Sequence, residues 1–81
     1  MIVKLNTKQF EFLETSLAKE RADLFKYLSN GNGVALELDD QIAVLIRDWV
    51  GEKLQEVGFD ENYELNDDGK ILEQLEDILF N

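Results

Sequence analysis

Between residues 6 and 29, apolar residues recur every three or four positions, which places them on one face of a helix. This face consists of Phe10, Leu13, Leu17, Leu24, Phe25 and Leu28. Asn6 or Thr7 can cap the helix, and Asn6 has the capping-box spacing from Gln9. A single helix to Ser29 would be roughly 34 Å long, slightly more than the diameter expected of a domain of 81 residues. The pattern therefore also allows a bend at residues 15–18.

Two short apolar segments, residues 1–5 and 34–38, are strand candidates on either side of that helix. In the second segment, V-A-L-E-L, we expect the first, third and fifth side chains to point inward. The sequence N-G-N-G at residues 30–33 ends the helix, because Gly and Asn tolerate the left-handed backbone at a helix terminus. The order strand, helix, strand predicts a parallel pair.

The rest of the chain has the pattern of two further helices. The first of them is capped by Asp39 or Asp40 and ends at Gly58. Its apolar face consists of Ile42, Leu45, Ile46, Trp49, Val50, Leu54 and Val57. The last helix is capped by Asn66, and a short third strand could precede it at residues 63–65. Its apolar face consists of Ile71, Leu72, Leu75, Ile78 and Leu79.

These elements predict an α+β fold in a single domain that spans residues 1–81. The element order is β-α-β-α-α, with a small sheet packed by three helices. A chain of 81 residues closes one modest apolar core, and a hydrophobic content of 44% is enough to pack it. We expect the helices to supply most of that core around Trp49.

Acidic residues are concentrated in the second part of the chain. The net charge is −10, and residues 37–81 carry fourteen acidic and three basic side chains, against four and five in residues 1–36. Such a field repels nucleic acid and anionic membranes and attracts basic surfaces, so we expect neither nucleic acid nor membrane as a partner. The chain has no cysteine and no apolar run typical of a signal peptide, so we expect a cytoplasmic protein.

The segment around Gly69, Y-E-L-N-D-D-G, has the composition of a calcium-binding loop. With Gly69 in the sixth position, Glu64, Asn66 and Asp68 take the first, third and fifth positions. The twelfth position, which needs a bidentate acid, is then the apolar Leu75. We therefore expect these polar residues to cap and charge the helix start, with no metal and no cofactor. A metal-binding or hydrolytic domain built on the three residues is the alternative.

The chain offers few side chains for catalysis. It has neither His nor Cys, which removes the commonest general base and the thiol nucleophile. Its glycines form neither the G-x-G-x-x-G pattern nor a P-loop. Paired carboxylates could hydrolyse glycosides only in a cleft, for which a domain this small leaves little room. We therefore expect a protein that is not an enzyme.

Acids on the last two helices follow a pattern that folding alone does not favour. Asp48, Glu52 and Glu56 recur every four residues, so like charges are neighbours at a cost of about 0.2 to 0.5 kcal/mol per pair. Glu76 and Asp77 lie near a helix C-terminus, where the helix dipole favours cations. A basic protein partner would explain the pattern. The alternative is that the acids only keep the protein soluble.

Three apolar residues fall outside the apolar faces of their helices: Phe12, Val44 and Phe80. An exposed aromatic residue can anchor a partner. The alternative, which we expect for both aromatic residues, is that the N-terminal strand covers Phe12 and that Phe80 docks with the chain end. The predicted partner-binding residues are Asp48, Glu52, Glu56, Glu73, Asp77 and Phe12.

The segment G-F-D-E-N-Y-E-L-N-D-D-G-K-I-L-E-Q-L-E-D-I-L, residues 58–79, resembles the closing segment of small acidic bacterial proteins of uncertain role, some of them similar to immunity proteins encoded beside toxins. The resemblance is strongest around Gly58, Phe59, Tyr63, Gly69 and Leu72. It contains no catalytic signature. It implies a protein that neutralises a toxin by binding it, and a basic target would suit the acids.

The sequence thus predicts a cytoplasmic interaction protein, of immunity or inhibitor type, that binds or sequesters a basic protein partner through an acidic face. The alternative is a structural or oligomerisation module whose acids serve solubility only. Homo-oligomerisation is compatible with both hypotheses.

Overall fold

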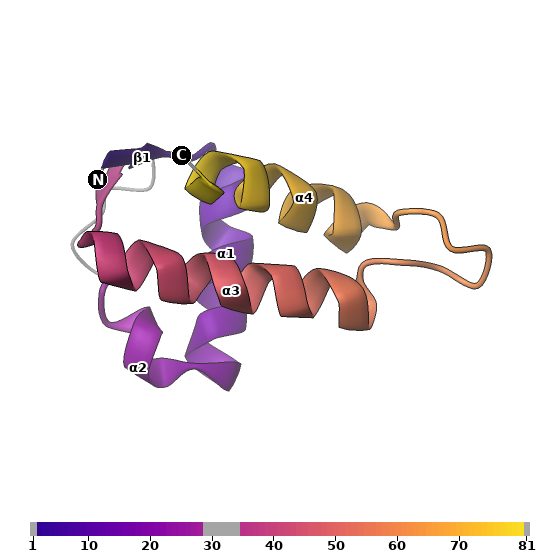
Figure 1. Ribbon diagram of the computed structural model, residues 1–81, viewed down its shortest axis with the longest axis horizontal. Helices are drawn as coiled ribbons and strands as arrows, with labels where there is room; N and C mark the ends of the chain where they lie inside the picture. The colour runs from indigo at the N-terminus through magenta and orange to yellow at the C-terminus, as the bar shows by residue number, and fades with distance from the viewer. Residues whose placement is uncertain (1, 29–34, 81) are drawn as a thin grey trace. The chain divides into compact units, whose positions relative to one another are not determined.

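The computed structural model describes residues 2–28 and 35–80. Within these ranges the chain is α+β, as predicted, with the elements β1 (Ile2–Lys4), α1 (Thr7–Glu20), α2 (Ala22–Phe25), β2 (Ala35–Glu37), α3 (Asp40–Val57) and α4 (Asp67–Phe80) (Figure 1). The chain divides into two compact units, Met1–Ala43 and Val44–Asn81, named here unit 1 and unit 2. None of the helices in the described ranges has a stretch both long and apolar enough to span a bilayer.

The sheet of unit 1 consists of β1 and β2, which pair antiparallel. Val3 lies opposite Leu36, and both are buried, while the positions on either side of them are exposed. The predicted alternation is confirmed for residues 35–38, and Val34 lies outside the described residues. The predicted parallel pairing is wrong. It assumed one uninterrupted helix between the strands, whereas the helix is broken, and antiparallel pairing is the more stable arrangement for each residue paired.

Helix α1 begins with the predicted capping box. The Gln9 backbone N–H donates to Asn6 Oδ1 at 2.7 Å, and the Asn6 backbone N–H donates to Gln9 Oε1 at 3.1 Å. These two bonds satisfy backbone donors that a helix start would otherwise leave unpaired. Leu13 and Leu17 of the predicted apolar face are buried.

Helix α1 ends at Glu20, well before the predicted end at Ser29 and later than the predicted bend at residues 15–18. At Arg21 the backbone leaves the helical region, with φ −141° and ψ 69°. The apolar face nevertheless continues beyond this break, because Leu24 in α2 is buried.

The break at Arg21 is held by hydrogen bonds on both sides of the residue. The Arg21 carbonyl accepts from the backbone N–H groups of Leu24 and Phe25, at 2.9 and 3.0 Å, which starts α2. The Arg21 guanidinium donates two bonds of 3.0 Å to the Asp23 carboxylate. These side-chain hydrogen bonds hold the pKa of Asp23 below its usual value of 3.8.

Unit 2 contains α3 from Val44 onward and all of α4, which runs back alongside it (Figure 1). Its buried apolar residues are Ile46, Trp49, Val50, Leu54, Ile71, Leu72, Leu75 and Leu79. The apolar arc of α3 is narrower than predicted, because Leu45 and Val57 are 44% and 40% exposed. At the start of α3, Asp39 Oδ1 accepts a 2.9 Å hydrogen bond from the Gln41 N–H, so one of the two predicted caps is confirmed.

Helices α3 and α4 meet at two glycines. The backbone of Gly69, in the first turn of α4, lies directly against the backbone of Gly58, the residue after α3. A Cβ at Gly58 would also lie 2.5 Å from the carbonyl oxygen of Leu54. Gly58 therefore ends α3 as predicted, but it is needed for close approach and not for a left-handed backbone.

The loop between the two helices does not contain the predicted third strand. Residues 63–65 form no strand, and a single antiparallel bridge joins Phe59 to Leu65. Tyr63 has a positive φ of 62°, and its side chain is 87% exposed. The loop thus carries an aromatic side chain on a backbone conformation that Gly or Asn would adopt more readily.

Candidate functional site

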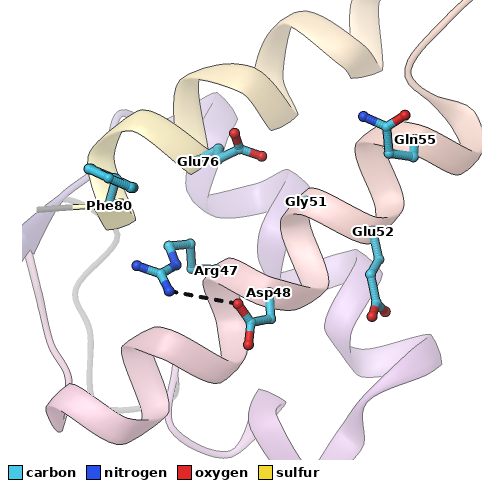
Figure 2. A pocket seen from close by; sticks show the side chains of 7 residues that line it. All are labelled: Arg47, Asp48, Gly51, Glu52, Gln55, Glu76 and Phe80. Atoms are coloured by element: carbon cyan, nitrogen blue, oxygen red, sulfur yellow. Dashed lines mark ion pairs between the residues drawn. The ribbon is translucent and has the colours of Figure 1, made fainter.

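An open groove of about 570 Å³ runs along unit 2 between α3 and α4 (Figure 2). It is lined by Arg47, Asp48, Gly51, Glu52 and Gln55 of α3 and by Glu76 and Phe80 of α4. The residues of α3 fall into two rows with a spacing of four, so they lie on adjoining strips of one helix face. Three of the lining side chains are carboxylates, and we name the site the acidic groove.

At Gly51, α3 presents no side chain to the groove. A Cβ at Gly51 would lie 3.3 Å from Glu76 Oε2, so the Glu76 carboxylate lies against the α3 backbone. Figure 2 shows Glu76 pointing from α4 across the groove toward α3. Gly in a helix interior costs roughly 0.5 to 1 kcal/mol relative to Ala, so α3 gives up intrinsic helix stability at this point.

Glu76 is half-buried in the groove. Within residues 2–28 and 35–80, no side chain forms an ion pair or hydrogen bond with its carboxylate. The guanidinium that lines the groove, that of Arg47, lies instead 3.8 Å from Asp48 Oδ1. A carboxylate forms its strongest hydrogen bonds with charged donors, so Glu76 retains the capacity to bind a cation.

Arg47 also lies over the Phe80 ring, with 5.7 Å between Cζ and the ring centroid. Its contact with Asp48, at 3.8 Å, is longer than a good hydrogen bond, and both side chains are partly exposed. Phe80 is 71% exposed, so the prediction that it docks with the chain end is wrong. Arg47 is therefore weakly held, and the Phe80 ring is an accessible surface for a cation.

The structure brings two of the predicted partner-binding residues, Asp48 and Glu52, into the acidic groove. Both point away from α4 in Figure 2, along the outer rim on α3. Glu56, Glu73 and Asp77 are exposed on the same two helices but do not line the groove. The acids beside the groove therefore extend its charge along the surface of unit 2.

Phe12, the remaining predicted residue, belongs to α1 in unit 1 and is half-buried. It is thus intermediate between the exposed anchor and the covered residue that the sequence allowed. The groove residues that were not predicted to bind a partner are Arg47, Gly51, Gln55, Glu76 and Phe80. A glycine within a helix and an aromatic residue outside the apolar face were the available signals for two of them.

Unit 2 carries most of the negative charge of the protein. Residues 44–81 include eleven acidic and three basic side chains, which give a net charge of −8. Neither α3 nor α4 has a basic residue in its last turn, where the helix dipole would favour one. The field at this surface is therefore attractive to cations.

The polar residues near Gly69 serve the helix start. Asn66 Oδ1 accepts a 2.7 Å hydrogen bond from the Gly69 N–H, so the prediction that Asn66 caps α4 is confirmed. Asp67 and Asp68 lie in the first turn, where the dipole favours acids. Among the residues that the structure describes, no three His, Cys, Asp or Glu side chains are arranged to hold a metal ion.

Comparison with known proteins finds no family model, no curated protein and no solved structure that matches this chain.

Proposed function

We propose that this chain is a non-catalytic cytoplasmic protein that binds a basic protein partner through its acidic face and thereby blocks or sequesters it. The acidic face consists of Asp48, Glu52, Glu56, Glu73, Glu76 and Asp77. The observation that carries the proposal is the Glu76 carboxylate, half-buried in the groove and unpaired among the described residues. The resemblance of residues 58–79 to immunity-like proteins is in keeping with such a role.

The cost of placing like charges side by side favours binding over solubility as the reason for these acids. Asp48, Glu52 and Glu56 are neighbours on α3, and each like-charged pair costs about 0.2 to 0.5 kcal/mol. A soluble protein could place the same acids elsewhere on its surface without that cost. A basic partner would turn the repulsion into attraction, and would associate faster because of the long-range field.

An oligomerisation module is the competing hypothesis. Its support is the exposure of Phe80 beside the groove, since an exposed ring is a frequent contact in interfaces. Self-association through this surface would bring together two units that each carry a net charge of −8. The charge therefore favours a basic partner over a second copy of the chain.

The proposal is tested with a partner isolated on the immobilised full chain and then purified. Association and dissociation rates are measured at two salt concentrations for the wild type and for the triple variant Asp48→Asn, Glu52→Gln, Glu56→Gln. We expect the triple variant to fold normally, to associate about tenfold more slowly at low salt and to lose part of the salt dependence of the rate. Wild-type rates would overturn the proposal.

A matched control separates the acidic face from net charge alone. The triple variant Glu11→Gln, Glu14→Gln, Glu37→Gln changes the charge by the same amount but in unit 1. We expect it to associate at close to the wild-type rate, because the proposed contact with the partner lies on α3 and α4 and includes none of these three acids. Equal slowing in both variants would mean that the acids of unit 2 are not the binding surface.

A further inference from the structure

Three features of the acidic groove favour the same kind of ligand group. The Glu76 carboxylate has no partner among the described residues, the Phe80 ring is exposed, and a guanidinium already lies over that ring. Glu76 and Phe80 are four residues apart on α4, so their side chains are neighbours. A carboxylate beside an aromatic face matches a guanidinium, which donates two parallel hydrogen bonds and stacks on rings.

We infer that the acidic groove receives an arginine side chain of the basic partner, whose guanidinium binds the Glu76 carboxylate and stacks on the Phe80 ring. This inference rests on the proposed function and gives the chemistry of the partner at the groove. In the free protein Arg47 lies over the ring, and the arginine of the partner replaces it.

Replacement is feasible because few contacts hold Arg47. Its guanidinium lies 5.7 Å from the Phe80 centroid and 3.8 Å from Asp48 Oδ1, and the Asp48 side chain is 61% exposed. Two guanidinium groups repel each other, so the arriving arginine displaces Arg47 toward the outer rim. Asp48 and Glu52 on that rim can then pair with the displaced cation.

Arginine fits this site better than lysine does. The Glu76 carboxylate lies beside the α3 backbone at Gly51, so a donor would reach it from the open side of the groove. A planar guanidinium can bind this carboxylate with one edge while one of its faces lies on the Phe80 ring. An ammonium is a compact and strongly hydrated charge, which gains less from such an arrangement.

The test uses N-acetyl-arginine N-methylamide as the probe, with the matching lysine compound for comparison. Binding to the full 81-residue chain is followed at low salt by NMR shifts of backbone amides and side-chain carboxylates. We expect saturable shifts at Gly51, Glu76 and Phe80, with a dissociation constant in the millimolar range. The lysine compound should bind about three- to tenfold more weakly.

Four variants locate the site, and urea unfolding verifies that each is folded. Glu76→Gln should weaken binding of the arginine compound about tenfold, and Phe80→Leu about threefold. Glu61→Gln, which removes the same charge from unit 2 but outside the groove and the acidic face, should leave binding nearly unchanged. Arg47→Met should tighten binding about threefold, because it removes both the competing cation and its repulsion.

Each alternative gives a different result. Equal weakening by Glu76→Gln and Glu61→Gln would show that the acidic field only concentrates the probe, and would overturn the inference. The proposed function would still be tested separately, by the rate at which the variant Asp48→Asn, Glu52→Gln, Glu56→Gln associates with the partner. Weaker or unchanged binding by Arg47→Met would overturn the displacement of Arg47. Shifts at the groove that follow protein concentration without probe would identify a second copy as the occupant and overturn the inference.

Discussion

The Nδ2 atom of Asn66 donates a 2.7 Å hydrogen bond to the carbonyl oxygen of Val57, the last residue of α3. Oδ1 of the same side chain accepts from the Gly69 N–H at 2.7 Å, and the Asn66 backbone N–H donates to the Gly58 carbonyl at 3.0 Å. Helix ends leave backbone groups unpaired, and Asn66 satisfies groups at the end of α3 and at the start of α4. It thereby fixes the junction of the two helices that form the acidic groove.

Replacement of Asn66 by Ala should destabilise the protein by about 2 kcal/mol, because both helix ends lose a hydrogen bond. Asn66→Asp is the matched control. It keeps the acceptor for Gly69 and adds a charge that suits the α4 N-terminus, but it cannot donate to Val57. We expect Asp to cost less than Ala, as measured by urea unfolding. Equal costs would show that the cap on α4 contributes nothing.

Two Gly→Ala substitutions should differ in their effect on stability. A Cβ at Gly69 would collide with the backbone of Gly58, which cannot move aside, so Gly69→Ala should destabilise by about 1 to 3 kcal/mol. A Cβ at Gly51 would lie 3.3 Å from the Glu76 carboxylate, which is the end of a flexible side chain. Gly51→Ala should therefore be neutral or stabilising by up to about 1 kcal/mol. Urea unfolding of both variants measures the difference. A strongly destabilised Gly51→Ala would contradict the position of the flexible Glu76 side chain beside Gly51.

Local patterns predicted the helix starts and the buried faces. Asn6 with Gln9 and Asn66 at the start of α4 behave as predicted, since each cap depends on residues within three positions. Leu13, Leu17, Leu72 and Leu75 are buried for the same reason, because their spacing follows the helix period. Caps and apolar helix faces depend on residues a few positions apart, so the sequence alone predicts them.

The break at Arg21 and the antiparallel sheet were not predictable from that pattern. Leu17, Leu24 and Leu28 keep helical spacing through the break, and no Gly or Pro marks it. The break depends on hydrogen bonds around Arg21 and on its pair with Asp23, and ordinary helix residues make both. The order strand, helix, strand did not determine the direction of the second strand, and β1 and β2 pair antiparallel.

The acidic groove was predicted in part. The four-residue spacing of Asp48 and Glu52 indicated a shared face, and both line the groove. Glu76 and Phe80 required knowledge of which flank of α4 lies beside α3. That flank is set by the contact of Gly58 with Gly69, which are eleven residues apart and form no pattern on one helix.

Tyr63 should be replaceable with a gain in stability. Its φ of 62° is a left-handed conformation that costs a typical residue about 1 to 2 kcal/mol, and its exposed ring offers little packing in return. Asn adopts this conformation readily, so Tyr63→Asn should stabilise by about 0.5 to 1 kcal/mol. Tyr63→Val should destabilise instead, because a β-branched residue is strained there. Urea unfolding measures both, and the same sign for Asn and Val would contradict the prediction.

Added sodium chloride should stabilise the fold. The net charge is −10, and the acids of α3 repel one another, so screening lowers the free energy of the folded state. The ion pair of Arg47 with Asp48 is exposed and 3.8 Å long, so its loss by screening costs little. Urea is the suitable denaturant, because guanidinium chloride is itself a salt. A lower unfolding midpoint at about 0.3 M sodium chloride would show that the acids are held in native ion pairs.

Reversal of one charge identifies which repulsion the salt relieves. Glu52 has Asp48 and Glu56 as like-charged neighbours one turn away on each side, so Glu52→Lys converts two repulsive pairs into attractive ones. It also places a cation toward the C-terminus of α3. We expect a gain of about 0.5 to 1 kcal/mol at low salt, which shrinks as sodium chloride is added. Glu61→Lys makes the same charge change in the loop and should gain less, because it lies on neither helix. If the two variants gain equally, the stabilisation comes from net charge. Repulsion among Asp48, Glu52 and Glu56 then does not destabilise the fold.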